Sequence, residues 1–432
     1  MIGAAKGGSW RAGFFVRMLG SAVVAQALLS AGNLCVGLIL IRHATDHDYG
    51  SYVLVLNALM LISQAQNQFI QPAMVLRMSG ASGSQRADLI GGLYREQRRF
   101  LPLAGMLAAI VALILGATNI LSWQASLLVL AAIAAGLATL HREFFRIVLL
   151  AYRRPVEVLQ VDALYVAMLV VGTLAGIFSP HPALTTVLTL CVAASTGGLL
   201  LAKALWRHEP WNIDGPPVMR SIVPIGTWTV AGSGIHWTFT QGNNYLVAGT
   251  LSVPTVAAIA ATRLLMMPVN MLSTGVGSLM LPTASAWQRA HGVRVVFIRL
   301  LLLCVGLAAI AAVYFGAIWL WRDWLFQVVF KKEFPQRDLL VLLWFGVFIL
   351  MIFRDQLLFL PLARGRYRLL TGLTLISAVV SLSVSYLTMV RIGMVGAVIG
   401  VIIGEAISVF GLVALSAMEL RRPASSLISS AA

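Results

Sequence analysis

The sequence has few charged residues for its length. Asp, Glu, Lys and Arg together make up 11% of its 432 residues, whereas an average soluble protein contains about 25%. Hydrophobic residues make up 59% of the chain, and the mean hydropathy is +0.89. The shortage of charge excludes an ordinary soluble enzyme, and the composition predicts a polytopic membrane protein.

Cysteines and nucleotide-binding motifs are also scarce or absent. Cys35, Cys191 and Cys304 lie far apart inside apolar segments, which excludes a metal site or a disulfide framework built on cysteine spacing. The sequence has no Walker A motif, so we expect no ATP hydrolysis by this chain. The net charge is +16, but the basic residues lie in short loops between apolar runs, so we expect no nucleic-acid partner. We also expect no cofactor and no metal.

The sequence is rich in long apolar segments. A membrane-spanning helix needs about 20 apolar residues, and on this criterion the sequence predicts twelve spans. They cover residues 18–41, 52–76, 101–117, 124–152, 157–178, 183–202, 222–247, 254–285, 296–319, 339–363, 369–390 and 395–417.

The distribution of basic residues predicts the orientation of these spans. Most of the 31 Lys and Arg residues fall in alternate loops, and cytoplasmic loops are the ones that carry such an excess. Both termini are therefore expected in the cytoplasm. The low content of Lys and the high content of Ala and Arg indicate a bacterial protein, for which we expect the inner membrane. The sequence therefore predicts four parts. A six-helix lobe covers residues 1–205, and a cytoplasmic linker covers 206–220. A second six-helix lobe covers 221–422, and a tail covers 423–432.

The two predicted lobes resemble each other in sequence. Arg142-Glu143 in the fourth span matches Arg354-Asp355 in the tenth, and Gly32-Asn33 matches Gly242-Asn243 about 210 positions later. Because six spans are an even number, both lobes enter the membrane in the same direction. The sequence therefore predicts a parallel repeat, in which the substrate path lies between the lobes.

Polar residues recur along single faces of four predicted spans. Such stripes point away from lipid, towards other helices or a watery cavity, although single amides also serve merely to hold helices together. The stripes give the following candidate substrate-binding residues: Gln26 and Asn33; Asn57, Gln64, Gln68 and Gln71; His236, Thr240 and Asn243; Arg263, Asn270 and Thr274.

Arg263 is the most unusual of these residues because it lies deep in an apolar run. It follows Pro254, a predicted helix start, and at 1.5 Å per residue it is roughly 14 Å into the span. A guanidinium at that depth needs an anionic partner or water. One interpretation is an ion pair with a buried acid. The other is that Arg263 faces an aqueous cavity and binds a phosphate, which suits its two-pronged donor geometry.

A second set of charged residues lies within the spans. It offers either a basic path or sites for ion coupling, and its arginines could equally serve only to orient the helices. This set consists of Arg142, Arg146, Arg354, Asp162, Asp355 and Glu405.

Two stretches carry a resemblance to a known family. In the first, Arg42 is followed by a polar linker and by Tyr49-Gly50 at the start of the next helix. In the second, an Ala-x-Gly-Arg loop at 363–366 precedes an apolar span, a short loop and GMVGA at 393–397. These stretches resemble bacterial polysaccharide exporters of the multidrug/oligosaccharidyl-lipid/polysaccharide (MOP) superfamily, and Wzx-type flippases in particular.

The resemblance implies a fold and a function. The fold is two six-helix bundles in a V shape, like that of multidrug and toxin extrusion (MATE) proteins. The function is to flip an undecaprenyl-diphosphate-linked oligosaccharide, such as an O-antigen or exopolysaccharide unit, with a basic cavity for the diphosphate. A polysaccharide polymerase and a chain-length regulator are the protein partners implied. The sequence departs from a symmetric cavity, because Val53 stands where the repeat places the counterpart of Arg263.

Two other functions remain open from the sequence. A cation-coupled MATE-like antiporter shares the fold, but it would more naturally carry buried carboxylates than buried arginines. A membrane-embedded polysaccharide polymerase or ligase would carry a large catalytic outer loop. The longest predicted outer loop, 320–338, has no histidine, so we expect a protein that is not an enzyme.

Overall fold

Helices make up almost all of the structure. The computed structural model describes residues 6–78, 83–152, 154–208, 211, 218–277, 280–364 and 366–421, and none of them forms a β-strand. The chain separates into two compact units, Met1–Gly234 and Ile235–Ala432, called here the N unit and the C unit. The predicted all-helical fold is confirmed.

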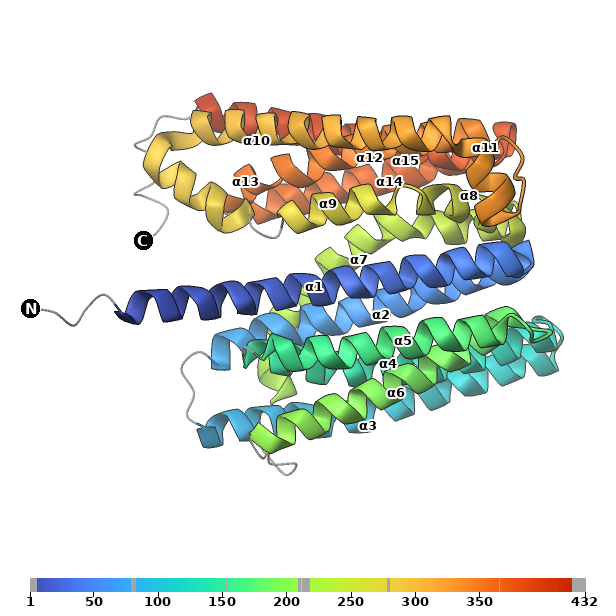
Figure 1. The fold of residues 1–432 in the computed structure, drawn as a ribbon, viewed down its shortest axis with the longest axis horizontal. Helices are drawn as coiled ribbons and strands as arrows, with labels where there is room; N and C mark the ends of the chain where they lie inside the picture. The colour runs from blue at the N-terminus through green and yellow to red at the C-terminus, as the bar shows by residue number, and fades with distance from the viewer. Residues whose placement is uncertain are drawn as a thin grey trace, which may run out of the picture. The chain divides into compact units, whose positions relative to one another are not determined.

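The N unit is built from six long helices and the first part of a seventh (Figure 1). Within it, α4 packs against α6, and α1 packs against α5. Helix starts follow the local sequence: the Ser122 hydroxyl accepts a hydrogen bond from the amide of Ala125 at 3.2 Å, as an N-cap should. The helices are α1 Lys6–His43, α2 Asp46–Met78, α3 Gly83–Ala117, α4 Trp123–Ala151, α5 Pro155–Gly176 and α6 Pro182–His208.

The C unit contains more breaks. Helix α7, Met219–Thr250, begins in the N unit and ends in the C unit. Gly292, with φ of 78°, interrupts α10 before the predicted ninth span. The helices that follow α7 are α8 Val253–Leu264, α9 Met267–Gly277, α10 Met280–Leu320, α11 Arg322–Trp324, a π-helix Leu325–Phe330, α12 Arg337–Leu357, α13 Phe359–Ala363, α14 Tyr367–Ile392 and α15 Met394–Arg421.

The eighth predicted span is not one continuous helix. Helices α8 and α9 are bent by 58° relative to each other. Pro268 explains the break, because a proline has no N–H and its ring clashes with the carbonyl four residues earlier, which here belongs to Leu264. At the same break the amide of Val269 donates to the carbonyl of Met266 rather than to that of Leu265, and the Tyr314 hydroxyl donates to the Leu265 carbonyl at 2.8 Å. The span is therefore broken and its open end is partly satisfied by α10.

The helices α14 and α15 pack closely through small residues. A side chain on Gly400 would overlap the backbone of Ser385, and one on Gly404 would overlap the side chain of Ser381. Ser385 also donates to the carbonyl of Ala397 at 3.0 Å. Glycines spaced four apart allow such close approach between membrane helices. This contact fixes α15, the helix that carries Glu405.

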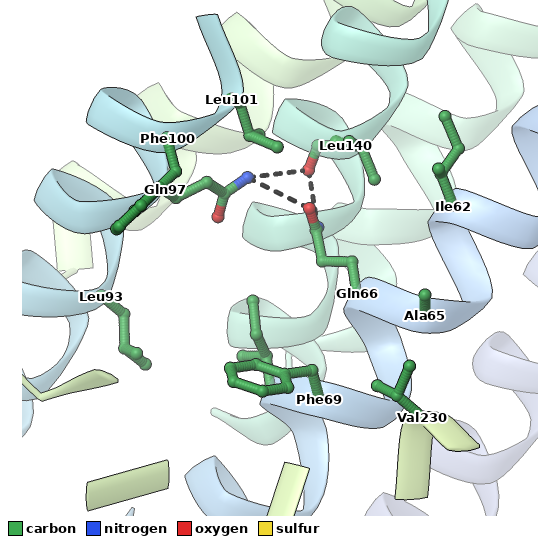
Figure 2. Close-up of a pocket in the computed structure, with 11 residues that line it drawn as sticks. Ile62, Ala65, Gln66, Phe69, Leu93, Gln97, Phe100, Leu101, Leu140 and Val230 are labelled. Atoms are coloured by element: carbon green, nitrogen blue, oxygen red, sulfur yellow. Dashed lines mark hydrogen bonds between the residues drawn. The ribbon is translucent and has the colours of Figure 1, made fainter. Parts of the chain in front are cut away.

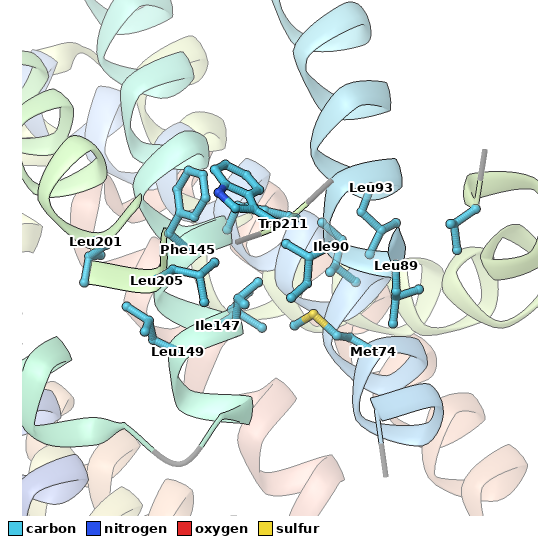
Figure 3. Close-up of a cluster of buried hydrophobic side chains, with 14 of the residues drawn as sticks. Met74, Leu89, Ile90, Leu93, Phe145, Ile147, Leu149, Leu201, Leu205 and Trp211 are labelled. Carbon is cyan, nitrogen blue, oxygen red and sulfur yellow. The ribbon is translucent and has the colours of Figure 1, made fainter. Parts of the chain in front are cut away.

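Aromatic and aliphatic side chains fill one end of the N unit (Figure 3). Trp211, which follows α6, is buried in this cluster, with its ring centroid 4.9 Å from that of Phe145 and 4.7 Å from that of Tyr94. The amide of Val218 donates to Glu96 at 3.1 Å. The predicted linker 206–220 therefore contacts the N unit through Trp211 and Val218.

The long apolar helices indicate the membrane spans. Among the described residues, nine helices are long and apolar enough to cross a membrane, and α8 with α9 makes a tenth if the bent pair is one span. Helices α7 and α12 lie where the seventh and tenth spans are predicted, but they are not among the nine. The protein is a multi-pass membrane protein. The count of twelve, the orientation, the V shape and the domain boundaries stay predictions, and the tail 423–432 lies outside the described residues.

Candidate functional site

A buried network of charges joins α4 to α5 in the N unit. Arg142 donates to Glu143 at 3.0 Å and forms a very short ion pair with Asp162. Arg146 donates to the other oxygen of Asp162 at 3.1 Å, and its Nη1 lies 3.6 Å from Glu143. The ring of Tyr165 lies 3.9 Å from the Arg142 guanidinium. We call these four charged residues the N network.

The pairing in the N network matters because two of its members are almost completely buried. Asp162 is 0% exposed and Arg142 is 3% exposed. A charge buried without a partner is very unfavourable, whereas one that is paired and hydrogen-bonded is tolerated. Two arginines and two acids have a formal sum of zero, so the network is balanced. Asp162 is held at the centre by both guanidiniums.

A polar pocket of about 250 Å³ lies next to the N network. Gln26 and Asn33 of α1 line it together with Arg142 and Arg146 of α4. The structure therefore brings together residues that the sequence assigned to two separate groups. Further polar residues of α1, α2, α4 and α5 complete the wall: Ser30, Ser63, Asn67, Thr139, Glu143 and Tyr165.

The predicted stripe on α2 does not face this pocket. Asn57 is buried, while Gln64 and Gln68 are exposed on the surface of the structure. The side chain of Gln71 lies outside the described residues. The pocket is lined instead by Ser63 and Asn67, each one position before a predicted residue. Because successive residues on a helix lie about 100° apart, a one-residue offset points a side chain to a different neighbour.

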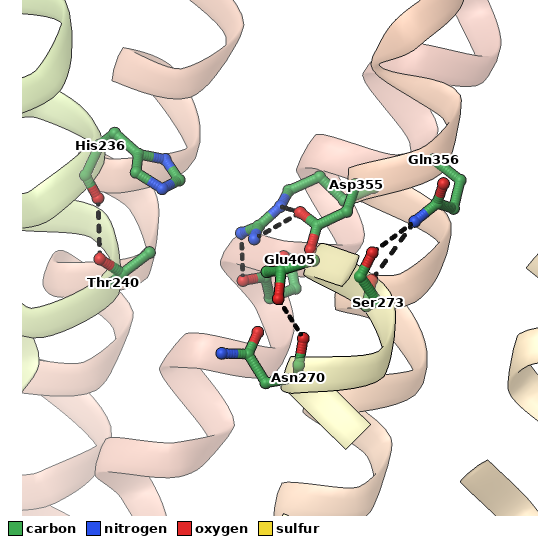
Figure 4. Close-up of polar contacts among 9 residues, drawn as sticks. His236, Thr240, Asn270, Ser273, Asp355, Gln356 and Glu405 are labelled. Carbon is green, nitrogen blue, oxygen red and sulfur yellow. Dashed lines mark hydrogen bonds and ion pairs between the residues drawn. The ribbon is translucent and has the colours of Figure 1, made fainter. Parts of the chain in front are cut away.

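The C unit has a corresponding network around Arg354 (Figure 4). Arg354 of α12 donates to Asp355 at 2.9 and 3.0 Å and to Glu405 of α15 at 2.6 Å. Glu405 is 2% exposed, and its second carboxylate oxygen has no hydrogen-bond partner among the residues the structure describes. One arginine with two acids gives this C network a formal charge of −1.

Arg263 lies at the break between α8 and α9, in the last turn of α8. Its guanidinium donates to the side-chain carbonyl of Gln241 at 3.1 Å and lies 5.3 Å from the ring of Trp344. An amide oxygen and an aromatic face are therefore two of the contacts that hold this guanidinium in place. Sequence reasoning did not select Gln241, which is on the helix that carries the third polar stripe.

The remaining predicted residues of the C unit do not converge on one described pocket. The hydroxyls of Thr240 and Thr274 donate to carbonyls of their own helices, those of His236 and Asn270, at 3.1 and 2.9 Å. The amide of Asn243 donates to the carbonyl of Ala397 at 3.3 Å and so ties α7 to α15. In Figure 4, His236 and Thr240 lie on one helix and Asn270 on another.

Comparisons with known proteins identify the fold. No protein-family model and no curated protein matches the sequence. Among solved structures, the chain is similar to an inward-facing multidrug resistance MATE family transporter of the MOP superfamily, with a TM-score of 0.73 and 13% identity over 92% of this chain and 98% of that chain.

Two further structures extend the likeness. The lipid II flippase MurJ, in an inward closed conformation, matches with a TM-score of 0.70 and 11% identity over 91% of this chain and 87% of that one. A MOP superfamily transporter from Pyrococcus furiosus matches with a TM-score of 0.65 and 13% identity over 94% and 95%. These neighbours are transporters and flippases rather than enzymes. At such low identity the likeness shows the fold, which is the MATE-like fold that the sequence predicted.

Proposed function

We propose that this protein flips an oligosaccharide linked to a polyprenyl diphosphate, such as undecaprenyl diphosphate, across the bacterial cytoplasmic membrane by alternating access. The cargo is an O-antigen, capsule or exopolysaccharide repeat unit, and a polymerase and a chain-length regulator act on it afterwards. The fold supports a transport function, and its neighbours include a lipid flippase as well as drug transporters.

The observation that carries this proposal is the pairing with arginine of the three acids that lie within the predicted spans. Asp162 is bonded to two arginines, and Asp355 and Glu405 are bonded to Arg354. An antiporter coupled to cations needs carboxylates that take up and release a cation. A guanidinium already bonded to the carboxylate competes with that cation for the same oxygens. Arg263 belongs to neither network as defined above, and a guanidinium is well suited to an anionic cargo.

The proposed roles follow from the chemistry of each group. Arg263 binds the diphosphate, because a guanidinium stays ionised and donates two parallel hydrogen bonds. The amides and hydroxyls of the N-unit pocket, including Gln26, Asn33 and Asn67, replace the water around sugar hydroxyls. The prenyl chain stays in the lipid. Transport then requires no covalent chemistry from the protein.

One observation favours a second function, a cation-coupled antiporter. The C network has one more acid than arginine, and the second oxygen of Glu405 has no hydrogen-bond partner among the described residues. A proton or a metal cation at that oxygen would balance the charge. This alternative places ion coupling at Glu405 and Asp355 and drug binding elsewhere.

Proteoliposomes containing the purified protein distinguish the two functions. One set receives a fluorescent prenyl-diphosphate oligosaccharide, and another receives a cationic dye with an imposed proton gradient. We expect movement of the lipid-linked sugar, slowed about tenfold by Arg263→Ala, because hydrogen bonds to a charged group contribute about 1.5–3 kcal/mol.

The control is Arg391→Ala, which removes an exposed arginine from the end of α14 and should leave the rate unchanged. Normal lipid transport by Arg263→Ala would refute the role of Arg263. Dye export without lipid movement would overturn the flippase proposal and favour the antiporter.

A further inference from the structure

A second pocket in the N unit has walls of a very different kind. It has a volume of about 440 Å³ and lies between α2, α3 and α4, with Val230 of α7 at its edge. Figure 2 shows α3 and α2 on opposite sides of the space and Leu140 of α4 above it. Apart from two glutamines, every lining residue is aliphatic or aromatic. The volume falls in the range of small-molecule sites.

The two glutamines form a small polar cluster inside this apolar pocket. Gln66 donates to the carbonyl of Leu140 at 2.8 Å. The Gln97 amide nitrogen donates to the Gln66 side-chain oxygen at 3.2 Å and to the Leu140 carbonyl at 3.3 Å. The amide nitrogen of Gln97 therefore uses its donors within the cluster. The cluster also fixes which way the Gln97 side chain points.

The side-chain oxygen of Gln97 receives no hydrogen bond in this arrangement. Gln97 is 7% exposed, and its Oε1 has no hydrogen-bond partner among the residues described. In Figure 2 this oxygen points into the space enclosed by Leu93 and Phe69. A buried acceptor without a donor is unfavourable. A water molecule would be a poor partner, because buried water needs two to four polar neighbours.

Two of the apolar residues that line the pocket are exposed. Phe100 is 64% exposed and Ile62 is 42% exposed, on α3 and α2, two helices apolar enough to span a membrane. An apolar opening on two such helices suits a ligand that arrives from the bilayer better than one that arrives from water.

We propose that this pocket binds a neutral long-chain lipid bearing a free hydroxyl, such as a fatty alcohol or a diacylglycerol. The hydrocarbon chain fills the apolar walls, and the hydroxyl donates a hydrogen bond to Gln97 Oε1. The pocket offers no charged residue among its lining residues, so a neutral head group fits it better than a phosphate. The proposal does not depend on the identity of the transported substrate.

Photolabelling of the whole protein in nanodiscs tests the proposal. The probes are a long-chain alkyl alcohol carrying a diazirine and the methyl ether of the same alcohol, which has the same chain but no donor. We expect the alcohol to label residues of α2 and α3 around the pocket at least about fivefold more than the ether, because only the alcohol satisfies the buried acceptor.

Two variants assign the preference to this pocket. Gln97→Leu should make the two probes label equally, and Ala65→Phe, which fills the space, should reduce labelling by both. Leu107→Phe is the matched control, since Leu107 lies on the same helix with 56% exposure and outside the pocket lining. Equal labelling of the unaltered protein by alcohol and ether, or labelling spread evenly over the exposed helices, would overturn the proposal.

Discussion

The N network and the C network differ in which residues bind the arginine that the two units have in common. Arg142 and Arg354 occupy matching positions, and each is followed by an acid to which it is bonded. The second acid comes from α5 in the N network and from α15 in the C network. In the order of the repeat, α15 corresponds to α6 rather than α5. The arginine is thus common to both units, while its second partner has a different helical origin.

This difference changes the charge of each network. The N network contains a second arginine, Arg146, and sums to zero, whereas the C network sums to −1. A balanced network is suited to holding helices together. An unbalanced one retains a carboxylate oxygen that can change its partner. Corresponding positions of the two lobes, such as Arg142 and Arg354, can therefore have different electrostatic roles.

The largest expected effect comes from removing one acid from each network. Asp162→Asn leaves two arginines facing one acid, so we expect a loss of about 3–5 kcal/mol in unfolding free energy. Glu405→Gln leaves Arg354 balanced by Asp355 and keeps an acceptor, so we expect a loss of about 1 kcal/mol. Denaturant unfolding of the purified variants in detergent measures both. Equal losses would show that formal charge does not distinguish the networks.

A smaller effect is expected from moving the helix that carries Glu405. Gly400→Ala places a methyl group against the backbone of Ser385, which should push α15 from α14 and cost about 1–3 kcal/mol. Gly306→Ala on α10 is the control, because nothing lies within 4 Å of its added Cβ. That control should be neutral or gain up to about 1 kcal/mol from helix propensity. A neutral Gly400→Ala would contradict close packing as the basis for the position of Glu405.

The smallest effect concerns the aromatic ring over each arginine. Tyr165 lies 3.9 Å from the Arg142 guanidinium, whereas Phe239 lies 5.6 Å from that of Arg354. Double-mutant cycles isolate each pair. We expect a coupling energy of about 1–2 kcal/mol for the first pair and about 0.5 kcal/mol for the second. A larger coupling energy for Arg354 and Phe239 than for Arg142 and Tyr165 would contradict this prediction.

Much of the fold could be predicted because hydrophobic length is a local property. The apolar segments predict the helices, and the repeated Arg-acid dipeptide marks Arg142 and Arg354 as corresponding residues of the two lobes. The break at Pro268 was also readable from the sequence, since a proline inside an apolar run disrupts the helix four residues back. The long eighth segment was instead predicted as one span.

The partners of the polar residues could not be predicted in the same way. Helical periodicity places Gln64 and Gln68 on one face, but it does not say which neighbouring helix that face meets. The pocket is lined by Asn67 instead, and the contacts of Arg263 include Gln241 and Trp344, which the polar stripes do not contain. Such contacts depend on helix rotation and tertiary packing. The unpaired oxygen of Gln97 results from contacts among α2, α3 and α4, which the sequence of one helix does not show.

The break between α8 and α9 also has an electrical consequence. A helix has a dipole that is negative at its C-terminal end and positive at its N-terminal end. Breaking one span in two therefore creates a negative end and a positive end inside the protein. Arg263 lies in the last turn of α8, at the negative end, where a cation is stabilised by about 0.3–1 kcal/mol. The proline that breaks the helix thus also makes its own membrane-buried arginine easier to accommodate.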